Sequence, residues 1–206
     1  MFADYHVHTA FSDDSVYPME NVIQDAIAMG MNEICLTDHV DYGVKIDWDC
    51  GKTIQYRNGE PLANVDYPRY MSDIERMKRL YGNKICIKTG LEFGIQKHTI
   101  PDFQRLFERY AFDFIILSIH QVENQEFWTQ DFQRGRSQKE YQQRYYEEML
   151  AVVKAYKDYS VLGHMDLIAR YDLAGAYIRE TQALLKSLGY KQFCTFEHMR
   201  PIFHDL

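Results

Sequence analysis

The stretch that organises the sequence is Asp4-Tyr5-His6-Val7-His8-Thr9. His6 and His8 are two positions apart, and residues two apart on a β-strand point to the same face of the sheet. Two imidazoles on one face, close to the end of a strand, make half of a metal site. We therefore expect the rest of the chain to supply the other ligands.

Length and composition favour a single domain with a packed core. The 206 residues are 46% hydrophobic and contain no low-complexity tract. No apolar run is long enough to cross a bilayer, and the first residues have neither the basic nor the apolar region of a signal peptide. We expect one domain over residues 1–206 and no membrane partner.

The charge and the cysteines restrict the partners and the compartment. A net charge of −7 without a basic cluster argues against nucleic acid as a partner, whereas a small anionic substrate held by metal ions remains compatible. The four cysteines form no CxxC pair, which is typical of reduced thiols in a cytoplasmic protein. They are Cys35, Cys50, Cys86 and Cys194.

Short apolar segments alternate with longer amphipathic ones, a pattern that predicts a mainly parallel α/β sheet, open or closed into a barrel. Expected strands cover 2–8, 33–37, 85–91, 113–119 and 160–163, with a weaker sixth at 192–196; expected helices cover 18–29, 66–80, 102–110, 139–157 and 179–188.

Two further segments have a predicted role in this architecture. An apolar stripe in the fourth expected helix, with Tyr141, Tyr145, Leu150 and Val153 near helical spacing, is expected to pack against the sheet. The segment 42–65 is rich in Gly, Asp and Asn, and we expect a long loop over the carboxyl end of the sheet that could act as a lid.

Metal-binding side chains recur where the expected strands end. Parallel sheets place their sites at the carboxyl ends of the strands, so side chains located there meet. Asp13 and Asp14 could cap the following helix, and one of them could instead be a ligand. The histidines outside this pattern, His98, His198 and His204, are expected to have no ligand role. The candidate ligands are His6, His8, Asp14, His39, Glu92, His120 and His164.

Mixed imidazole and carboxylate ligands suit zinc, manganese or iron. Seven candidates exceed the needs of one tetrahedral ion, so we expect two or three divalent ions with Glu92 as a bridging carboxylate. Clustered divalent ions suit the hydrolysis of phosphate esters. We expect Glu92 and His164 to act in catalysis. Arg170 could bind the phosphate, or could instead form a surface pair with Asp166 or Asp172.

Taken together and in order, these motifs resemble the polymerase-and-histidinol-phosphatase (PHP) superfamily, and its histidinol-phosphatase branch in particular. The resemblance is carried by His6-x-His8, Thr37-Asp38-His39, Gly90-Leu91-Glu92, Ser118-Ile119-His120 and Gly163-His164-x-Asp166. The opening residues 4–9 and the run from Leu36 to Gly43 fit that branch especially well.

The resemblance implies a distorted seven-stranded (β/α) barrel with a trinuclear metal site, and hydrolysis of L-histidinol phosphate in histidine biosynthesis. It implies ligand roles for the seven candidates, with Asp14 at a position where the family has a histidine or an acidic residue and Asp13 as the alternative. It also implies that Arg170 holds the substrate phosphate.

The sequence departs from the family near its end. The family carries a late Asp-x-His motif, whereas residues 1–177 resemble the first part of the family and 178–206 its C-terminal end, as if about two β–α units were missing near Tyr177-Ile178. Barrel closure requires a fixed number of strands, and an open edge must be covered or paired. We therefore expect an incomplete barrel, with a homodimer as one way to cover the edge.

Two functions remain open from the sequence. One is an active histidinol-phosphatase with a reduced metal site. The other is a metal-binding, catalytically impaired relative with an internal deletion. A nuclease-like role is disfavoured by the acidic charge.

Overall fold

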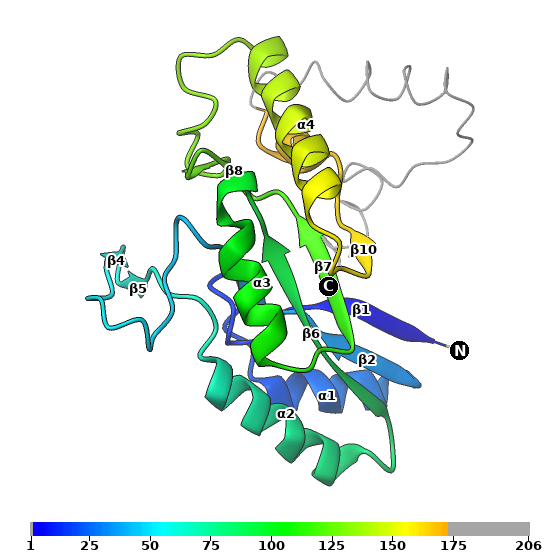
Figure 1. Cartoon of the computed structure of the whole chain (residues 1–206). Helices are drawn as coiled ribbons and strands as arrows, with labels where there is room; N and C mark the ends of the chain where they lie inside the picture. The colour runs from blue at the N-terminus through cyan, green and yellow to red at the C-terminus, as the bar shows by residue number, and fades with distance from the viewer. Residues whose placement is uncertain (1, 173–206) are drawn as a thin grey trace, which may run out of the picture.

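Six strands form one curled parallel sheet in the computed structural model, which describes residues 2–172 (Figure 1). The order along the sheet is β1 (Ala3–Val7), β2 (Glu33–Leu36), β6 (Cys86–Gly94), β7 (Phe114–Ser118) and β10 (Val161–Leu162), and β3 (His39–Val40) also pairs with β6. Every pairing in this sheet is parallel. The predicted α/β class and the five main strands are confirmed; the weaker strand at 192–196 lies outside the described residues.

Strand β6 lies at the centre of this sheet and pairs with more strands than any other. Its first half pairs with β2 and its second half with β3, while β7 runs along its other edge. A side chain at Gly90 would place a Cβ 2.7 Å from both the Cys35 sulfur and the Phe114 carbonyl oxygen. Glycine at this position therefore allows β2, β6 and β7 to approach closely.

Helices cover the outside of the curled sheet (Figure 1). They are α1 (Met19–Ala28), α2 (Tyr67–Tyr81), the 3₁₀ turn η1 (Lys97–Thr99), α3 (Ile100–Arg109), α4 (Gln138–Ala155) and a short α5 (Leu167–Arg170). Local signals set their starts: the Asp66 carboxylate accepts the Arg69 amide at α2, and Ser137 and Glu140 form a reciprocal capping box at α4. The first four predicted helices are confirmed, and the fifth, 179–188, lies outside the described residues.

The core lies between the helices and the sheet. On α3, Phe103 is fully buried, and its ring centroid is 4.7 Å from that of Phe93 on β6. On α4, Tyr141 and Tyr145 are buried as predicted, but the prediction was wrong for Leu150, which is 52% exposed. The other buried residues of this helix are Met149 and Val152, which continue the stripe at true helical spacing.

The segment 42–65 is more structured than the sequence indicates. It contains a short antiparallel hairpin, β4 (Tyr56–Arg57) with β5 (Glu60–Pro61). A second hairpin pairs β8 (Gln121–Val122) with β9 (Gln125–Glu126). Arg57 forms an ion pair with Glu126, and its guanidinium lies 5.3 Å from the centroid of the Trp128 ring. The segment is therefore tied to the neighbouring loop.

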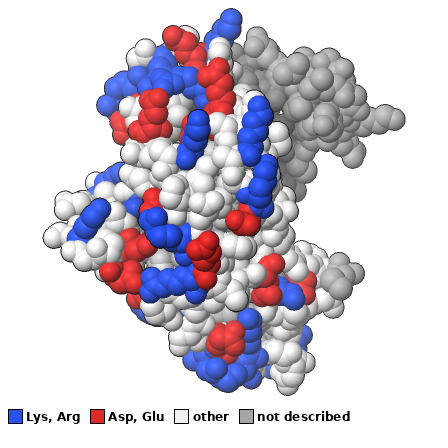
Figure 2. Space-filling view, viewed as in Figure 1, with Lys and Arg blue, Asp and Glu red and all other residues white. Residues whose placement is uncertain are grey.

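The described helices are unsuited to crossing a membrane, and the face seen in Figure 2 carries both charges. None of the helices within residues 2–172 combines the length and apolarity needed to cross a bilayer. Figure 2 shows basic and acidic side chains interspersed over the viewed face. This face therefore offers no continuous basic stripe of the kind that follows a nucleic-acid backbone.

Replacing Phe103 with Ala is expected to lower the free energy of unfolding by about 3–5 kcal/mol, because it removes a fully buried ring that packs on β6. Urea unfolding of the metal-free protein measures this change. The matched control is Leu150→Ala on the exposed side of α4, with an expected change within about 0.5 kcal/mol. Equal losses in the two variants would contradict the core assignment.

Candidate metal centre

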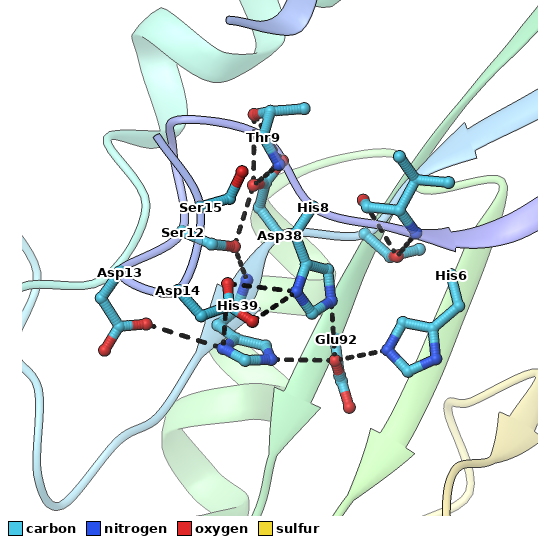
Figure 3. Close-up of polar contacts among 12 residues, drawn as sticks. His6, His8, Thr9, Ser12, Asp13, Asp14, Ser15, Asp38, His39 and Glu92 are labelled. Atoms are coloured by element: carbon cyan, nitrogen blue, oxygen red, sulfur yellow. Dashed lines mark hydrogen bonds and ion pairs between the residues drawn. The ribbon is translucent and has the colours of Figure 1, made fainter. Parts of the chain in front are cut away.

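One buried carboxylate, that of Glu92 on β6, is the centre of the site. Its side chain is fully buried, and five imidazoles point their Nε2 atoms at its two oxygens (Figure 3 shows three of these contacts). The distances from Nε2 to the nearer carboxylate oxygen are 2.8 Å for His6, 3.0 Å for His8, 3.0 Å for His39, 3.0 Å for His120 and 2.7 Å for His164.

The five imidazoles form a closed circle around this carboxylate. Neighbouring ring centroids are 4.3 to 5.8 Å apart, in the order His6, His8, His39, His120, His164 and back to His6. His6 and His8 lie at the end of β1, His39 follows β2 as the first residue of β3, and His120 and His164 follow β7 and β10, so the rings gather at the carboxyl end of the sheet. Parallel pairing therefore brings together residues that are up to 158 positions apart in the sequence (164 − 6).

The donor set fits divalent cations better than hydrogen bonds alone. A carboxylate offers about four lone-pair sites. Glu92 has six polar neighbours, the five imidazoles and the Ser118 hydroxyl, which donates to it at 2.6 Å. Six donors cannot all be satisfied by one buried carboxylate, whereas cations placed between the carboxylate and the nitrogens would use each nitrogen lone pair. Imidazole and carboxylate are the ligands that zinc, manganese and iron accept.

Three of the imidazoles have a second carboxylate at Nδ1. Asp14 lies 2.9 Å from His8, Asp13 lies 3.6 Å from His39, and Asp41 lies 2.7 Å from His120. Such outer carboxylates fix the tautomer and the orientation of an imidazole that binds metal through its other nitrogen.

His164 differs from these three rings. Its Nδ1 is buried and has no hydrogen-bond partner among the described residues. Burial lowers the pKa of His164, so its ring is neutral at neutral pH. The site therefore combines carboxylate-supported imidazoles with one that is neutral and unsupported at Nδ1.

The electrostatics of the metal-free site are dominated by these contacts. Burial alone would raise the pKa of Glu92, but the neighbouring imidazoles, His120 foremost, hold it well below its usual value. Burial alone would likewise lower the pKa of His8 and His120. The carboxylates around them instead raise both pKa values to about 10. Without metal, these two rings are therefore protonated at neutral pH.

A buried aspartate holds the two loops that carry His8 and His39 together (Figure 3). The Asp38 carboxylate accepts the Thr9 backbone amide at 2.7 Å and the Ser12 hydroxyl at 2.9 Å. The Ser12 oxygen in turn accepts the His39 backbone amide at 2.9 Å. The loop after β1 is thereby fixed to the loop after β2, which sets the separation of the two imidazoles.

A cavity of about 490 Å³ opens beside this cluster. Its lining includes Glu92, His164 and Arg170, together with Glu126 and Trp128 at the linked hairpins. The volume is in the range of small-molecule sites.

The structure brings all seven predicted ligands and Arg170 to one place. It leaves His98 outside, where the ring is exposed and lies 2.9 Å from the Asn124 side-chain oxygen. His198 and His204 lie outside the described residues. Sequence reasoning missed Asp41 and Lys45, which line the same cavity, and Ser118. The position of Asp41, two residues after His39, is a signal that it lies near the site, whereas no comparable feature marks Lys45.

Comparison with known proteins settles the family. The PHP domain model matches residues 4–194. The chain therefore belongs to the PHP domain family. It is 32% identical over 169 residues to the histidinol-phosphatase of Lactococcus lactis subsp. lactis, covering 82% of this chain and 58% of that protein. A protein named probable histidinol-phosphatase from Clostridium acetobutylicum is 25% identical over 171 residues, covering 83% of this chain and 60% of that protein.

Solved structures agree with the PHP fold. The crystal structure of the Lactococcus lactis histidinol phosphate phosphatase, complexed with zinc, L-histidinol and phosphate, superposes with a TM-score of 0.71 at 29% identity. The match covers 87% of this chain and 65% of that one. A Listeria monocytogenes structure matches with a TM-score of 0.62 at 18% identity, which supports the fold alone. The expected PHP-type barrel is confirmed as a curled, partly complete one, and the chain spans about 58% of the Lactococcus protein's length.

Metal binding to the site is expected to release protons. In the metal-free fold the pKa values of His8 and His120, about 10, exceed the value of 6.5 for an unperturbed histidine. Their protonated forms therefore stabilise the metal-free protein fully below pH 6.5, and this contribution is lost as pH rises through about 10. Ligand nitrogens must be deprotonated, so metal affinity should rise over the same interval. Calorimetry in two buffers of different ionisation enthalpy measures the released protons, and none released would contradict this account.

Proposed function

We propose that this chain is a metal-dependent phosphomonoesterase that hydrolyses L-histidinol phosphate to L-histidinol and phosphate. The observation that carries the proposal is the fully buried Glu92 carboxylate inside a closed circle of five imidazoles. The similarity to the Lactococcus lactis histidinol-phosphatase supports the choice of substrate.

The charge of the cavity supports a need for cations. Its lining carries five carboxylates, Asp13, Asp14, Asp41, Glu92 and Glu126, against one lysine and one arginine, Lys45 and Arg170. The protonated His8 and His120 offset part of this negative charge only in the metal-free site, because nitrogens that bind metal are deprotonated. With the imidazoles in that neutral form, the carboxylates would repel a phosphate monoester unless cations were bound. Two or three bound divalent ions would reverse the local charge, lower the pKa of a bound water and neutralise the phosphate oxygens. We propose zinc, manganese or iron in this role.

We assign the ligand role to the predicted set, with Glu92 as the bridging carboxylate. Asp14 can serve as a ligand or as the outer partner of His8, from which it lies 2.9 Å. Glu92 and His164 are proposed to lie at the reacting centre, since their side chains are 2.7 Å apart and both line the cavity. The full ligand set is His6, His8, Asp14, His39, Glu92, His120 and His164.

Arg170 is proposed to bind the substrate phosphate. It ends the short helix α5, three residues after a buried Leu167, and it lines the cavity that contains Glu92. A guanidinium offers two parallel N–H donors to a phosphate, a geometry that fixes the phosphorus atom relative to the reacting water.

We further propose a small phosphorylated molecule as the natural partner, a cytoplasmic location, and a homodimer as one way to cover the open barrel edge. The free thiols of Cys35, Cys50 and Cys86 fit a reducing compartment. Within the described residues, β1 and β10 are the outer strands of the sheet path, and each offers an edge that another chain can cover.

A second candidate is a metal-binding, catalytically impaired relative with an internal deletion. The observation that favours it is length, because the chain covers only 58% and 60% of the first two curated relatives. The proposed junction near Tyr177-Ile178 lies outside the described residues.

One experiment separates these candidates. Elemental analysis of the purified chain is combined with an assay of histidinol phosphate hydrolysis on the same sample. Two or three ions per chain with turnover supports the phosphatase. Bound metal without turnover supports the impaired relative, and no bound metal overturns both.

Replacing His120 with Ala is expected to lower metal content and phosphatase activity together, because its Nε2 is one of the five that converge on Glu92. Loss of an outer partner of a metal ligand typically lowers metal affinity by about 10- to 100-fold, so loss of the ligand itself should lower it at least as much. His98→Ala, an exposed histidine outside the circle, is the control and should change neither quantity. Normal metal content in His120→Ala would exclude a ligand role.

Replacing Arg170 with Ala is expected to raise KM for histidinol phosphate at least about 10-fold while the metal content stays unchanged, since hydrogen bonds to charged groups contribute about 1.5–3 kcal/mol. Steady-state kinetics and elemental analysis on one sample measure both. Arg105→Ala on the exposed side of α3 serves as control. Loss of metal in Arg170→Ala would show that the residue is structural instead.

A further inference from the structure

Lys45 is a buried cation beside the metal centre that the proposed reaction has not used. Its side chain is only 4% exposed. Its Nζ atom lies 2.8 Å from an Asp13 oxygen and 2.8 Å from an Asp41 oxygen. Burying an ammonium and two carboxylates has a large desolvation cost. We therefore expect Lys45 to have a role in the neighbouring metal centre.

The two carboxylates that hold Lys45 each reach an imidazole of the circle. Asp41 lies 2.7 Å from His120 Nδ1, and Asp13 lies 3.6 Å from His39 Nδ1. The opposite nitrogens of these two rings, the Nε2 atoms, each lie 3.0 Å from the Glu92 carboxylate. The contacts therefore close into a loop that runs through Glu92, His39, Asp13, Lys45, Asp41, His120 and back to Glu92.

The Lys45 ammonium also determines whether Asp13 and Asp41 are available to bind a metal ion. By geometry alone, Asp41 could bind an ion with His39 and His120, and Asp13 could bind one with Asp14 and His39. Lys45 already supplies the cation for both carboxylates at hydrogen-bond distance. Asp13 and Asp41 are thereby held on the outer side of the imidazoles, where they orient rings that bind through Nε2.

We propose that Lys45 is a positioning residue of the metal centre, which through Asp13 and Asp41 fixes His39 and His120 to hold one of the divalent ions. The proposal depends on the metal centre of the proposed function but not on the identity of the substrate.

A direct contact between Lys45 and substrate phosphate explains the geometry less well. An ammonium has three N–H donors, and two of them are taken by Asp13 and Asp41. With 4% of the side chain exposed, little of it faces the cavity. Burial alone would lower the pKa of Lys45, but the two aspartates raise it above its ordinary value, so the side chain remains a permanent cation that neutralises them.

Replacing Lys45 with Met tests the proposal, because Met keeps an unbranched apolar stem and removes the charge. Metal-free wild type and K45M are titrated with Co²⁺, and visible absorption reports both affinity and coordination geometry. We expect about 10-fold weaker binding of one ion in K45M, with an altered spectrum for that ion. The matched control is K52M, an exposed lysine of the same segment, which should bind like wild type.

Kinetics on the same samples separate positioning from substrate contact. At limiting Co²⁺, the kcat of K45M should fall in proportion to the fraction of molecules that lack the weakly bound ion. At saturating Co²⁺, its KM for histidinol phosphate should stay within twofold of the wild-type value. Unchanged Co²⁺ affinity with a KM raised 10-fold would overturn the proposal in favour of substrate contact. If the wild-type protein binds Co²⁺ but does not turn over, the proposed function is contradicted, and the absorption titration still tests the role of Lys45. If the wild-type protein binds no Co²⁺, both the proposed function and the role of Lys45 are overturned.

A second variant guards against misfolding, since K45M leaves Asp41 buried without its cation. K45M/D41N removes that charge and keeps an oxygen beside His120. Circular dichroism of the metal-free protein confirms folding. Co²⁺ affinity that stays lowered in this folded double variant supports the positioning role, because no anchored carboxylate then orients His120. Affinity restored to the wild-type value would show that Lys45 only balances charge, and would overturn the proposal.

Discussion

The structure depends on one buried charge, the carboxylate of Glu92. A fully buried carboxylate is strongly unfavourable unless cations or hydrogen-bond donors surround it. Here five imidazoles and a serine hydroxyl do so, drawn from segments at both ends of the described chain. The strands must therefore bring their carboxyl ends close to the Glu92 carboxylate. The curl of the sheet makes this possible and also packs the core.

Strand β6 meets this constraint through its glycines as well as its glutamate. Gly90 lets the flanking strands approach. Gly94 lies where a Cβ would come 1.9 Å from an Asp41 oxygen and 2.6 Å from His120 Nδ1. The hydrogen bond between Asp41 and His120 thus occupies the space of an absent side chain. The central strand supplies the Glu92 carboxylate and also the space for the Asp41 carboxylate, which contacts the His120 imidazole.

Much of this arrangement could be predicted from the sequence because the signals are local. An apolar β-branched run followed by histidine marks both a strand and the site at its end, as before His120 and His164. The short pairings β3, β8 and β9 were not predictable, since two-residue strands carry no periodicity and are fixed by tertiary contacts such as His39 beside Glu92. On α4, Leu150 and Met149 are equally apolar, so only the helix orientation decides that Met149 is buried.

Lys45 shows a different limit of sequence reasoning. A lysine in a polar loop is ordinarily solvated, and nothing in the run from Gly43 to Trp48 distinguishes this one. Its burial follows from two carboxylates that lie at hydrogen-bond distance from the ammonium, Asp41 four residues earlier in the chain and Asp13 in the loop after β1. These carboxylates are required there by the imidazoles, and the imidazoles by Glu92. Lys45 thus ends a chain of contacts that begins at the buried Glu92 and runs through the imidazoles and the outer carboxylates. Its role can be inferred only from the three-dimensional arrangement of all these residues.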